Sequence, residues 1–490
     1  MKKVVIIGGG LGGLSAAVTL AYQGLNVQLF EKNEHFGGKL MPVQLGHYAF
    51  DFGPNTITMP YVFQQVIEQT GERAEDYFEL IKLPAHTRNV FSNGTELIFS
   101  SDQQQMVAQL ERLDPAGARR YPAFIKEITR LYNLSQQYFL PRTFRSWRDY
   151  LSPSLGAALL QVRPWQTLDH FFRSYFSNPK VIEAYNRYAT YIGSSPYQTP
   201  ATFAMIAYLE MVEGVYYVKG GNTKMAEAFT TIAKKWGAQL HNHSMVKKIL
   251  VSKQRATAVE LANGERIEAD YIIMNADLLT AYPELVSEEV RPAFPNKKVE
   301  QLEPSISAFV ILAGVNKRFP QLMHHNVYFS SDYKQEFMDL FNRQTYSEQP
   351  TIYICNSSYT DVTRSPNGDN LFILVNAPAL PSIRQLQIDP QAYKEKIYAR
   401  LATQGIDLAP HLVEEQIFTP ATIAETFGAF RGALYGLSAN RKKAAFLRPQ
   451  NKSKDIVNLY FVGGSTHPGG GSPMVTISGQ NVASSIIETI

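Results

Sequence analysis

The first 31 residues constrain the fold of this chain more strongly than any other segment. Residues 4–7 (VVII) form an apolar run that predicts a buried strand, and a glycine-rich loop follows directly. Residues 14–22 then predict a helix, and residues 27–30 predict a second buried strand. A strand, a glycine loop, a helix and a strand in this order predict a β-α-β unit.

The glycine loop matches the pattern G-x-G-x-x-G at Gly8, Gly10 and Gly13. In such a loop Gly8 allows the tight turn, and Gly10 lets the backbone approach a pyrophosphate. Gly13 lets the helix pack closely against the strand. The helix N-terminus that follows offers free N–H groups and a positive dipole end to phosphates. Glu31 ends the second strand, where a carboxylate binds ribose hydroxyls and disfavours the 2′-phosphate of NADP. This unit alone leaves both FAD and NAD open.

The composition is that of a globular protein with more than one domain. The chain has 490 residues, 45% hydrophobic and 18% charged, and one compact core does not extend over this length. Zinc-finger spacings, basic runs and RNA-binding signatures are absent from the sequence, so we expect no nucleic-acid partner. Cys355 is the only cysteine, and its strand-like surroundings predict a buried hydrophobic residue rather than a nucleophile.

Three separate segments (1–78, 218–288 and 455–490) are predicted to form one discontinuous dinucleotide-binding domain. The middle segment has a predicted helix at 223–236 and predicted strands at 246–251, 256–261 and 266–275. Asn263-Gly264 separates the last two strands and favours a hairpin turn, because both residues tolerate positive φ. Residues 459–462 predict a buried strand that leads into a second glycine-rich loop and a helix.

Two further regions lie between these segments. Residues 79–217 are predicted to be a helical, aromatic-rich region that faces a membrane, and residues 289–454 a mixed-sheet substrate domain. In the second region, strands are predicted at 308–312, 326–329, 351–355 and 371–376, and a helix at 390–405. No run of 18 apolar residues occurs, so we expect no membrane-spanning helix. Glycines interrupt the N-terminal apolar run, so we expect no export signal there.

Four further motifs occur together and in the same order as in one family of flavoproteins. They are Gly37-Gly38-Lys39, Asp51-Phe52-Gly53-Pro54, Lys219-Gly220-Gly221 and the segment GGSTHPGGGSP at 463–473. With these motifs, essentially the whole chain resembles the bacterial carotenoid desaturase/oxygenase family, which comprises phytoene desaturase-like flavoproteins. Within that family it is most similar to the staphylococcal-type enzymes for C30 carotenoids. Segments 191–195, 431–436 and 469–480 favour the oxygenase branch over dehydrosqualene desaturase.

The resemblance implies an α/β fold with FAD as the cofactor. The FAD-binding domain would be Rossmann-like and discontinuous, of the glutathione-reductase/amine-oxidase type, with the helical and mixed-sheet substrate domain inserted. The implied contacts are Gly8, Gly10 and Gly13 with the pyrophosphate, Glu31 with the adenosine ribose, Lys39 with the phosphates, Val246 with the adenine, and Gly464 and Met474 with the ribityl and flavin end. Met474 also starts a predicted helix, whose free N–H groups stabilise negative charge on a reduced flavin.

His467 is the candidate catalytic residue, because it lies next to the predicted flavin site and an imidazole can transfer a proton. The alternative is a loop histidine that binds backbone groups before Pro468.

The pair His324-His325 shows no further ligand at a metal-binding spacing, so we predict no metal site. Lining of a substrate tunnel or simple packing is the expected role of this pair.

Residues 119–150 interleave basic and aromatic side chains. This pattern favours a segment lying on an anionic membrane leaflet, with a solvated helical face as the alternative. We therefore expect a cytoplasmic protein that is peripheral (monotopic) on the inner face of the cell membrane, from which a carotenoid substrate enters an apolar tunnel. The candidate tunnel walls, which ordinary core packing explains equally well, are Tyr208, Met211, Tyr216 and Tyr217.

The resemblance implies oxidation of the terminal methyl groups of a C30 carotenoid (diaponeurosporene or diapolycopene) to aldehydes. The alternative within the family is a desaturase of the dehydrosqualene or phytoene type, which introduces conjugated double bonds. Two remoter alternatives are a non-enzymatic lipid escort similar to the GDP-dissociation inhibitors and an amine oxidase. Intact glycine motifs at both ends of the chain disfavour the escort, and Thr466-His467-Pro468 disfavours the amine oxidase.

Overall fold

The N-terminal β-α-β unit forms as predicted. In the computed structural model, which describes residues 1–143, 149, 152–382 and 388–490, β1 (Lys3–Ile7) and β2 (Asn26–Phe30) are parallel neighbours. α1 (Leu11–Tyr22) connects them. Four of the five residues of β1 are buried. This burial fits a strand that is covered on both faces, because side chains alternate between the two faces of a sheet.

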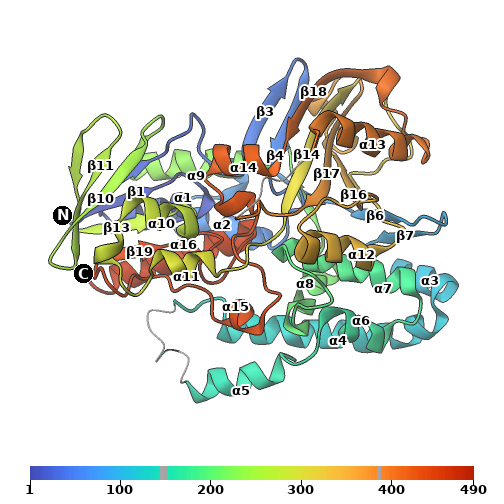
Figure 1. Cartoon of the computed structure of the whole chain (residues 1–490), viewed down its shortest axis with the longest axis horizontal. Helices are drawn as coiled ribbons and strands as arrows, with labels where there is room; N and C mark the ends of the chain where they lie inside the picture. Colours follow the sequence, from blue (N-terminus) through green and yellow to red (C-terminus); the bar gives the residue numbers. More distant parts are fainter. Residues whose placement is uncertain (144–148, 150–151, 383–387) are drawn as a thin grey trace.

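β1 is the middle strand of a five-stranded parallel sheet with the order β19-β13-β1-β2-β9. Helices α1, α9 and α16 pack on one face, while a small sheet, β10-β11-β12, and α10 pack on the other (Figure 1). These elements come from three separate parts of the chain, and both termini lie on this side of the molecule. The bounds are α9 (Lys224–Lys235), β9 (Gln239–His241), β10 (Val246–Ser252), β11 (Arg255–Leu261), β12 (Arg266–Glu268), β13 (Tyr271–Met274), α10 (Leu278–Leu285), β19 (Leu459–Phe461) and α16 (Ser472–Ile487).

The single strand predicted at 266–275 is wrong, because the chain divides it into β12 and β13. β12 pairs antiparallel with β11, whereas β13 enters the parallel sheet beside β1. The carboxylate of Asp270 fixes this change of direction by accepting hydrogen bonds from the Lys3 N–H and the Lys2 ammonium, both at 2.9 Å. No glycine or proline marks the break, so the sequence pattern continues through it. The predicted turn at Asn263-Gly264 is confirmed, with Gly264 at φ +87°.

The mixed-sheet region contains a seven-stranded sheet with the order β18-β14-β17-β16-β15-β6-β7. The four predicted strands and the predicted helix form, and β18 was not predicted. β6 and β7 were placed in the helical region 79–217, and this placement is wrong because β6 pairs parallel with β15. The division into three domains otherwise stays a prediction. The bounds are β6 (Thr87–Val90), β7 (Glu96–Phe99), β14 (Ser307–Val315), β15 (His325–Tyr328), β16 (Ile352–Asn356), β17 (Asp369–Ala377), α13 (Pro390–Ala402) and β18 (Leu412–Phe418).

The helical region packs along one edge of this sheet, at the lower right of Figure 1. Its core consists largely of aromatic rings, such as Phe176 stacked on Tyr185 with centroids 4.6 Å apart. A short 3-10 helix (Arg187–Ile192) follows α7, and a π-helical turn (Leu209–Glu213) follows α8. The helices are α3 (Gln103–Leu113), α4 (Pro115–Tyr138), α5 (Pro153–Gln161), α6 (Leu168–Tyr175), α7 (Pro179–Asn186) and α8 (Met205–Tyr208).

The remaining elements connect these layers. β3 and β4 form a two-stranded antiparallel sheet, and β5 and β8, which are distant in the sequence, form another. No described helix combines the length and the apolar composition that crossing a bilayer requires. The bounds are β3 (Met41–Leu45), β4 (Tyr48–Phe52), α2 (Pro60–Glu68), β5 (Leu80–Lys82), β8 (Tyr216–Val218), α11 (Asn296–Glu300), α12 (Tyr333–Met338), α14 (Pro420–Phe427) and α15 (Lys442–Phe446).

Of the aromatic residues of segment 119–150 that the structure describes, three are buried, and Tyr138 and Phe139 are half-buried. Tyr121, Phe124 and Tyr132 of α4 are buried, and the first two belong to the core of the helical region. The guanidinium of Arg130 pairs with Glu127 at 2.8 Å. These contacts contradict an interfacial role for the aromatic face of α4. Phe144, Arg145, Trp147 and Arg148, which belonged to the same prediction, lie outside the described residues.

Candidate cofactor site

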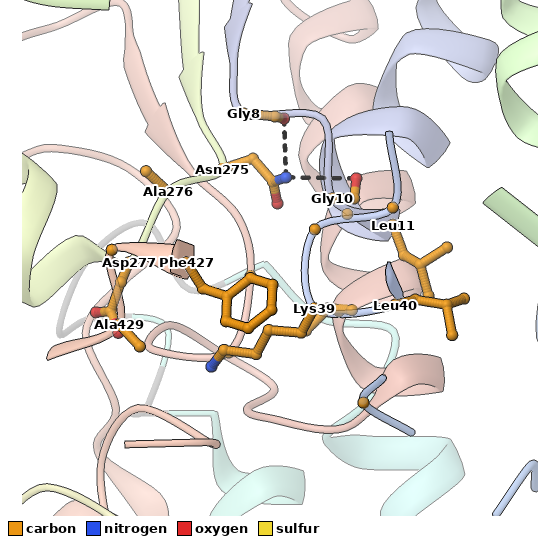
Figure 2. A pocket seen from close by; sticks show the side chains of 18 of the residues that line it. Gly8, Gly10, Leu11, Lys39, Leu40, Asn275, Ala276, Asp277, Phe427 and Ala429 are labelled. Atoms are coloured by element: carbon orange, nitrogen blue, oxygen red, sulfur yellow. Dashed lines mark hydrogen bonds between the residues drawn. The ribbon is translucent and has the colours of Figure 1, made fainter. Parts of the chain in front are cut away.

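A cavity of about 390 Å³ opens at the carboxyl ends of the parallel strands. The loop after β1, the segment 37–40 and the residues after β13 form one part of its wall (Figure 2). The loop after β19 and the first turn of α16 form another part. Open α/β sheets bind nucleotides at the carboxyl ends of their strands, because helix N-termini converge there.

The glycine loop has the geometry that its sequence predicts. Gly8 has φ +99°, a conformation that side-chain-bearing residues rarely adopt. A Cβ on Gly13 would lie 2.3 Å from the carbonyl oxygen of Gly8, so only glycine lets α1 start this close to β1. Gly8 and Gly10 both line the cavity, and Gly10 immediately precedes α1. Their predicted contact with a pyrophosphate fits this placement.

Glu31 and Val246 both line the cavity. One carboxylate oxygen of Glu31 accepts a hydrogen bond from the Gly9 N–H at 2.7 Å, and the other accepts from the Asn33 N–H at 2.9 Å. Glu31 therefore shapes the glycine loop in addition to its predicted role toward a ribose. Carboxylate oxygens each carry more than one acceptor site, so these bonds leave capacity for a hydroxyl.

Lys39 extends into the cavity past Phe427 (Figure 2). Its ammonium donates hydrogen bonds to the carbonyl oxygens of Leu434 at 2.6 Å and Ala433 at 3.2 Å. Burial lowers the pKa of Lys39, and the nearby carboxylate of Asp277 opposes this shift. Lys39 thus ties the segment after Gly38 to residues 433–434, while its predicted contact with phosphates stays a prediction.

The second glycine-rich loop forms another part of the wall. Gly464 lines the cavity, as do Ser472 and Val475 in the first turn of α16. Met474 lies in that same turn, but its side chain packs in an apolar cluster with Met59. Any contact of Met474 with a flavin would therefore come from its backbone N–H, at the positive end of the helix.

His467 does not belong to the wall of the cavity. Burial lowers the pKa of its imidazole to about 4, and Nε2 lies 2.9 Å from the carbonyl oxygen of Phe139. The carbonyl oxygen of His467 accepts hydrogen bonds from the Asn451 amide at 2.8 Å and the Ser478 hydroxyl at 3.1 Å. These contacts support the alternative interpretation, a loop histidine that holds backbone segments together.

Asn275 is a site residue that sequence reasoning missed. Its amide nitrogen donates to the carbonyl oxygens of Gly8 at 2.9 Å and Gly10 at 3.4 Å, which braces the glycine loop (Figure 2). Asn275 follows β13 directly, and β13 is the parallel neighbour of β1. The only available signal was a polar residue at the end of an apolar strand. The pairing of that strand with β1 is not visible in the sequence.

The pair His324-His325 has a third potential ligand beside it, contrary to the sequence-based expectation. In the part of the chain that the structure describes, the potential ligand atoms of His324, His325 and Cys355 lie within 4.8 Å of one another. All three residues are buried. In each histidine, Nδ1 forms a hydrogen bond with a hydroxyl group. Nδ1 of His324 lies 2.6 Å from Thr360 Oγ1, and Nδ1 of His325 lies 2.9 Å from Tyr353 Oη. The absence of a metal site stays a prediction.

The four candidate tunnel residues are part of packed clusters and do not line the cavity. Met211 is fully buried, and its sulfur accepts a hydrogen bond from the Tyr185 hydroxyl at 3.8 Å. Tyr217 is buried with its ring centroid 4.9 Å from that of His324. Tyr208 stacks on Tyr132 with centroids 4.2 Å apart. Their contacts match the packing alternative, and Tyr216 is half-buried in β8.

The residues of the cavity fit FAD on physical grounds. The two glycine loops bring bare backbone and two helix N-termini to one space, which suits a pyrophosphate flanked by two larger groups. The wall includes both the Glu31 carboxylate and the first turn of α16. Phe427 and Tyr435 also belong to the wall.

Replacing Lys39 by methionine is expected to weaken FAD retention about 10- to 100-fold, because two charge-assisted hydrogen bonds are lost inside the cavity. Lys32→Met is the matched control. Lys32 lines the same cavity, but its ammonium is exposed and donates only to the Glu425 carbonyl at 3.1 Å. The measurement is the FAD dissociation constant from flavin fluorescence. Equal losses in the two variants would contradict the role given to Lys39.

Comparison with known proteins agrees with this geometry. A family model described as flavin-containing amine oxidoreductase matches residues 11–487. The chain is 34% identical to 4,4′-diapolycopene oxygenase of Methylomonas sp, over 99% of this chain and 98% of that protein. It is 33% identical to 4,4′-diaponeurosporene oxygenase of Staphylococcus haemolyticus, with 99% and 97% covered. It is 34% identical to zeta-carotene-forming phytoene desaturase of Myxococcus xanthus, with 98% and 93% covered.

Solved structures share the fold at low sequence identity. Cyclohexylamine oxidase from Brevibacterium oxydans superposes with a TM-score of 0.61 at 17% identity, over 100% of this chain and 99% of that one. A Rab GDI from Plasmodium falciparum superposes with a TM-score of 0.55 at 11% identity, with 96% and 94% covered. The fold is thus that of the FAD-binding amine oxidases, FAD is the cofactor, and the chain belongs to the flavin-containing amine oxidoreductase family.

Proposed function

We propose that this oxidoreductase oxidises the terminal methyl groups of a C30 carotenoid, of the diaponeurosporene or diapolycopene type, to aldehydes. The observation that carries the proposal is similarity over nearly the full length to two proteins named as oxygenases of these carotenoids. The chain also has a cavity whose wall includes both glycine-rich loops. A desaturase is the second candidate, because one relative of the same identity is named phytoene desaturase.

The residues of this chain would bind and orient the reactants. FAD, when bound, accepts a hydride and in its reduced form reacts with oxygen. The backbone of the two glycine loops would hold the cofactor, and the N-terminus of α16 would favour negative charge placed beside it. Phe52, Phe372 and Phe427 line the cavity, and the Phe52 ring contacts the other two. This apolar surface would exclude water from the reacting carbon.

Product analysis tests the proposal directly. The chain is expressed in cells that accumulate diaponeurosporene or diapolycopene, and the carotenoids are extracted and analysed by mass spectrometry. We expect products that gain one oxygen and lose two hydrogens for each oxidised methyl group. Products that only lose pairs of hydrogens would contradict the oxygenase and support the desaturase. A purified protein that stays colourless after addition of FAD would contradict both and favour the lipid escort.

We further propose that the protein binds the surface of an anionic membrane, from which the carotenoid enters. The support is a surface formed by α5, α15 and their flanking residues. Leu160 and Trp165 are 70% and 73% exposed, and Leu447 is 49% exposed. Arg441, Lys442 and Lys443 are exposed, and the Lys442 ammonium lies 4.3 Å from the Trp165 ring centroid. Exposed apolar residues next to basic residues suit the headgroup region of a bilayer.

We propose the same location that the sequence predicts: the protein is cytoplasmic and binds the inner face of the cell membrane.

Charge reversal tests this surface. The variant carrying Arg441→Glu, Lys442→Glu and Lys443→Glu is expected to bind phosphatidylglycerol-containing vesicles at least about tenfold more weakly, since each basic residue near such a surface contributes about 1 kcal/mol. The matched control carries Lys247→Glu, Lys248→Glu and Lys253→Glu, three exposed residues of β10 and its turn. Vesicle cosedimentation measures both variants. Equal weakening in the two triple variants would contradict the assignment of this face.

A further inference from the structure

Five polar residues are buried together between the seven-stranded sheet and the helical region. We name them the buried polar cluster: His86, Arg187, Glu210, His324 and His325. His86 precedes β6, and the two other histidines lie at the start of β15, which is the parallel neighbour of β6. Arg187 begins the 3-10 helix after α7, and Glu210 lies in the π-helical turn after α8. The ends of two strands and two short irregular helices therefore converge on one point.

The charged pair at the centre is only loosely bonded to itself. Nη2 of Arg187 lies 3.8 Å from Oε2 of Glu210, and Nδ1 of His86 lies 3.6 Å from the same oxygen. Glu210 is instead satisfied by two tyrosines: the Tyr188 hydroxyl donates to Oε2 at 2.9 Å, and the Tyr191 hydroxyl donates to Oε1. The carboxylate has two tyrosine donors, whereas the guanidinium makes one long hydrogen bond, from Nη1 to the Tyr191 hydroxyl at 3.5 Å, and lies near the rings of Tyr188 and Tyr191.

Several donor and acceptor atoms of the cluster have no hydrogen-bond partner among the described residues. They are Nε and Nη2 of Arg187 and Nε2 of His86, His324 and His325. Leaving one buried polar atom without a partner is costly, and native proteins rarely do so. Five such atoms in one cluster indicate a site that another polar group completes.

The cluster adjoins the cofactor cavity through two bridges. Tyr435 lines the cavity, and a Cβ on Gly193 would lie 2.7 Å from its ring, so the 3-10 helix that begins at Arg187 ends against the cavity wall. On the other side, Thr56 contacts Tyr191 of the same helix and Tyr353 beside His325. Thr56 lies two residues after Pro54, another wall residue.

The charges of the cluster favour a neutral ligand. Arg187 stays protonated, because a guanidinium does not lose its proton in proteins, and Glu210 balances it. Burial lowers the pKa of His86 to about 4 and that of His324 to about 3, and it also lowers the pKa of His325. The three imidazoles are then neutral at pH 7. A carboxylate ligand would face Glu210 without a surplus positive charge.

We propose that the buried polar cluster binds the oxygen atom at the oxidised end of the polyene, an alcohol or aldehyde, with Arg187 as the principal donor. This inference rests on the proposed function and deepens it. A pure hydrocarbon gains nothing from unpaired donors in its binding site, whereas a carbonyl or hydroxyl oxygen accepts their hydrogen bonds. The cluster would hold the substrate after the first oxygen is present.

Direct binding tests the proposal without requiring turnover. The FAD-loaded protein in detergent micelles is titrated with C30 polyenes that end in a methyl, an aldehyde or a carboxylate group, and quenching of flavin fluorescence gives each dissociation constant. In the wild type we expect the aldehyde to bind more tightly than the other two. Arg187→Met is expected to weaken aldehyde binding about 10- to 100-fold and to change binding of the hydrocarbon by less than about twofold.

Two further variants keep the test decisive if Arg187→Met does not fold. Arg187→Lys keeps the charge beside Glu210, and the double variant Arg187→Met with Glu210→Gln removes both charges; each is expected to lose the preference for the aldehyde. Arg291→Met is the matched control, since Arg291 is equally buried but bonded through Nε, Nη1 and Nη2 to Val286, Phe294 and Asn296. It should keep the preference.

Two results would overturn the proposal: a wild type that binds the aldehyde no better than the hydrocarbon, or a variant of Arg187 that weakens all three ligands equally. Failure of the proposed function has a different signature. A wild type that only desaturates would fail the product analysis, while its binding preference would still report on the cluster.

Discussion

The close approach of α1 and α16 is the contact on which the rest of this structure depends. A Cβ on Gly479 would lie 2.1 Å from the carbonyl oxygen of Gly12, so no other residue lets the two helices meet there. The Ser15 hydroxyl donates to the Thr476 carbonyl at 2.9 Å across the same interface. This contact joins the first helix of the chain to the last one and aligns their N-termini on a single cavity. Two glycine loops at opposite ends of the sequence thereby become one binding site.

The cofactor cavity and the buried polar cluster arise in the same way. In each, segments that are distant in the sequence meet at the ends of strands. At the parallel sheet, Asn275 braces the glycine loop, and Lys39 ties its neighbourhood to residues 433–434. At the seven-stranded sheet, the histidines of the buried polar cluster meet Arg187 and Glu210 from the helical region. The first site is built from backbone and suits a cofactor that many enzymes share. The second is built from side chains, and it is there that a choice of substrate can be made.

The sequence predicted the parts that depend on local pattern. The β-α-β unit, the Asn263-Gly264 turn and the helix at α9 follow from periodicity and glycine chemistry, and all three form. It failed where pairing between distant segments decides the outcome. β6 pairs with β15, which lies far away in the sequence, and Arg88 stands opposite Asn326. The role of Asn275 and the buried position of Phe124 likewise depend on neighbours that no local pattern reveals.

The central claim is that the two glycine loops hold opposite halves of one FAD molecule. A crystal structure of the FAD-loaded protein tests it most directly. The account predicts the pyrophosphate against Gly8 and Gly10, the adenosine between Glu31 and Val246, and the isoalloxazine beside Gly464 and the N-terminus of α16. A cofactor bound in the reverse direction, or one that contacts only the N-terminal loop, would contradict the account.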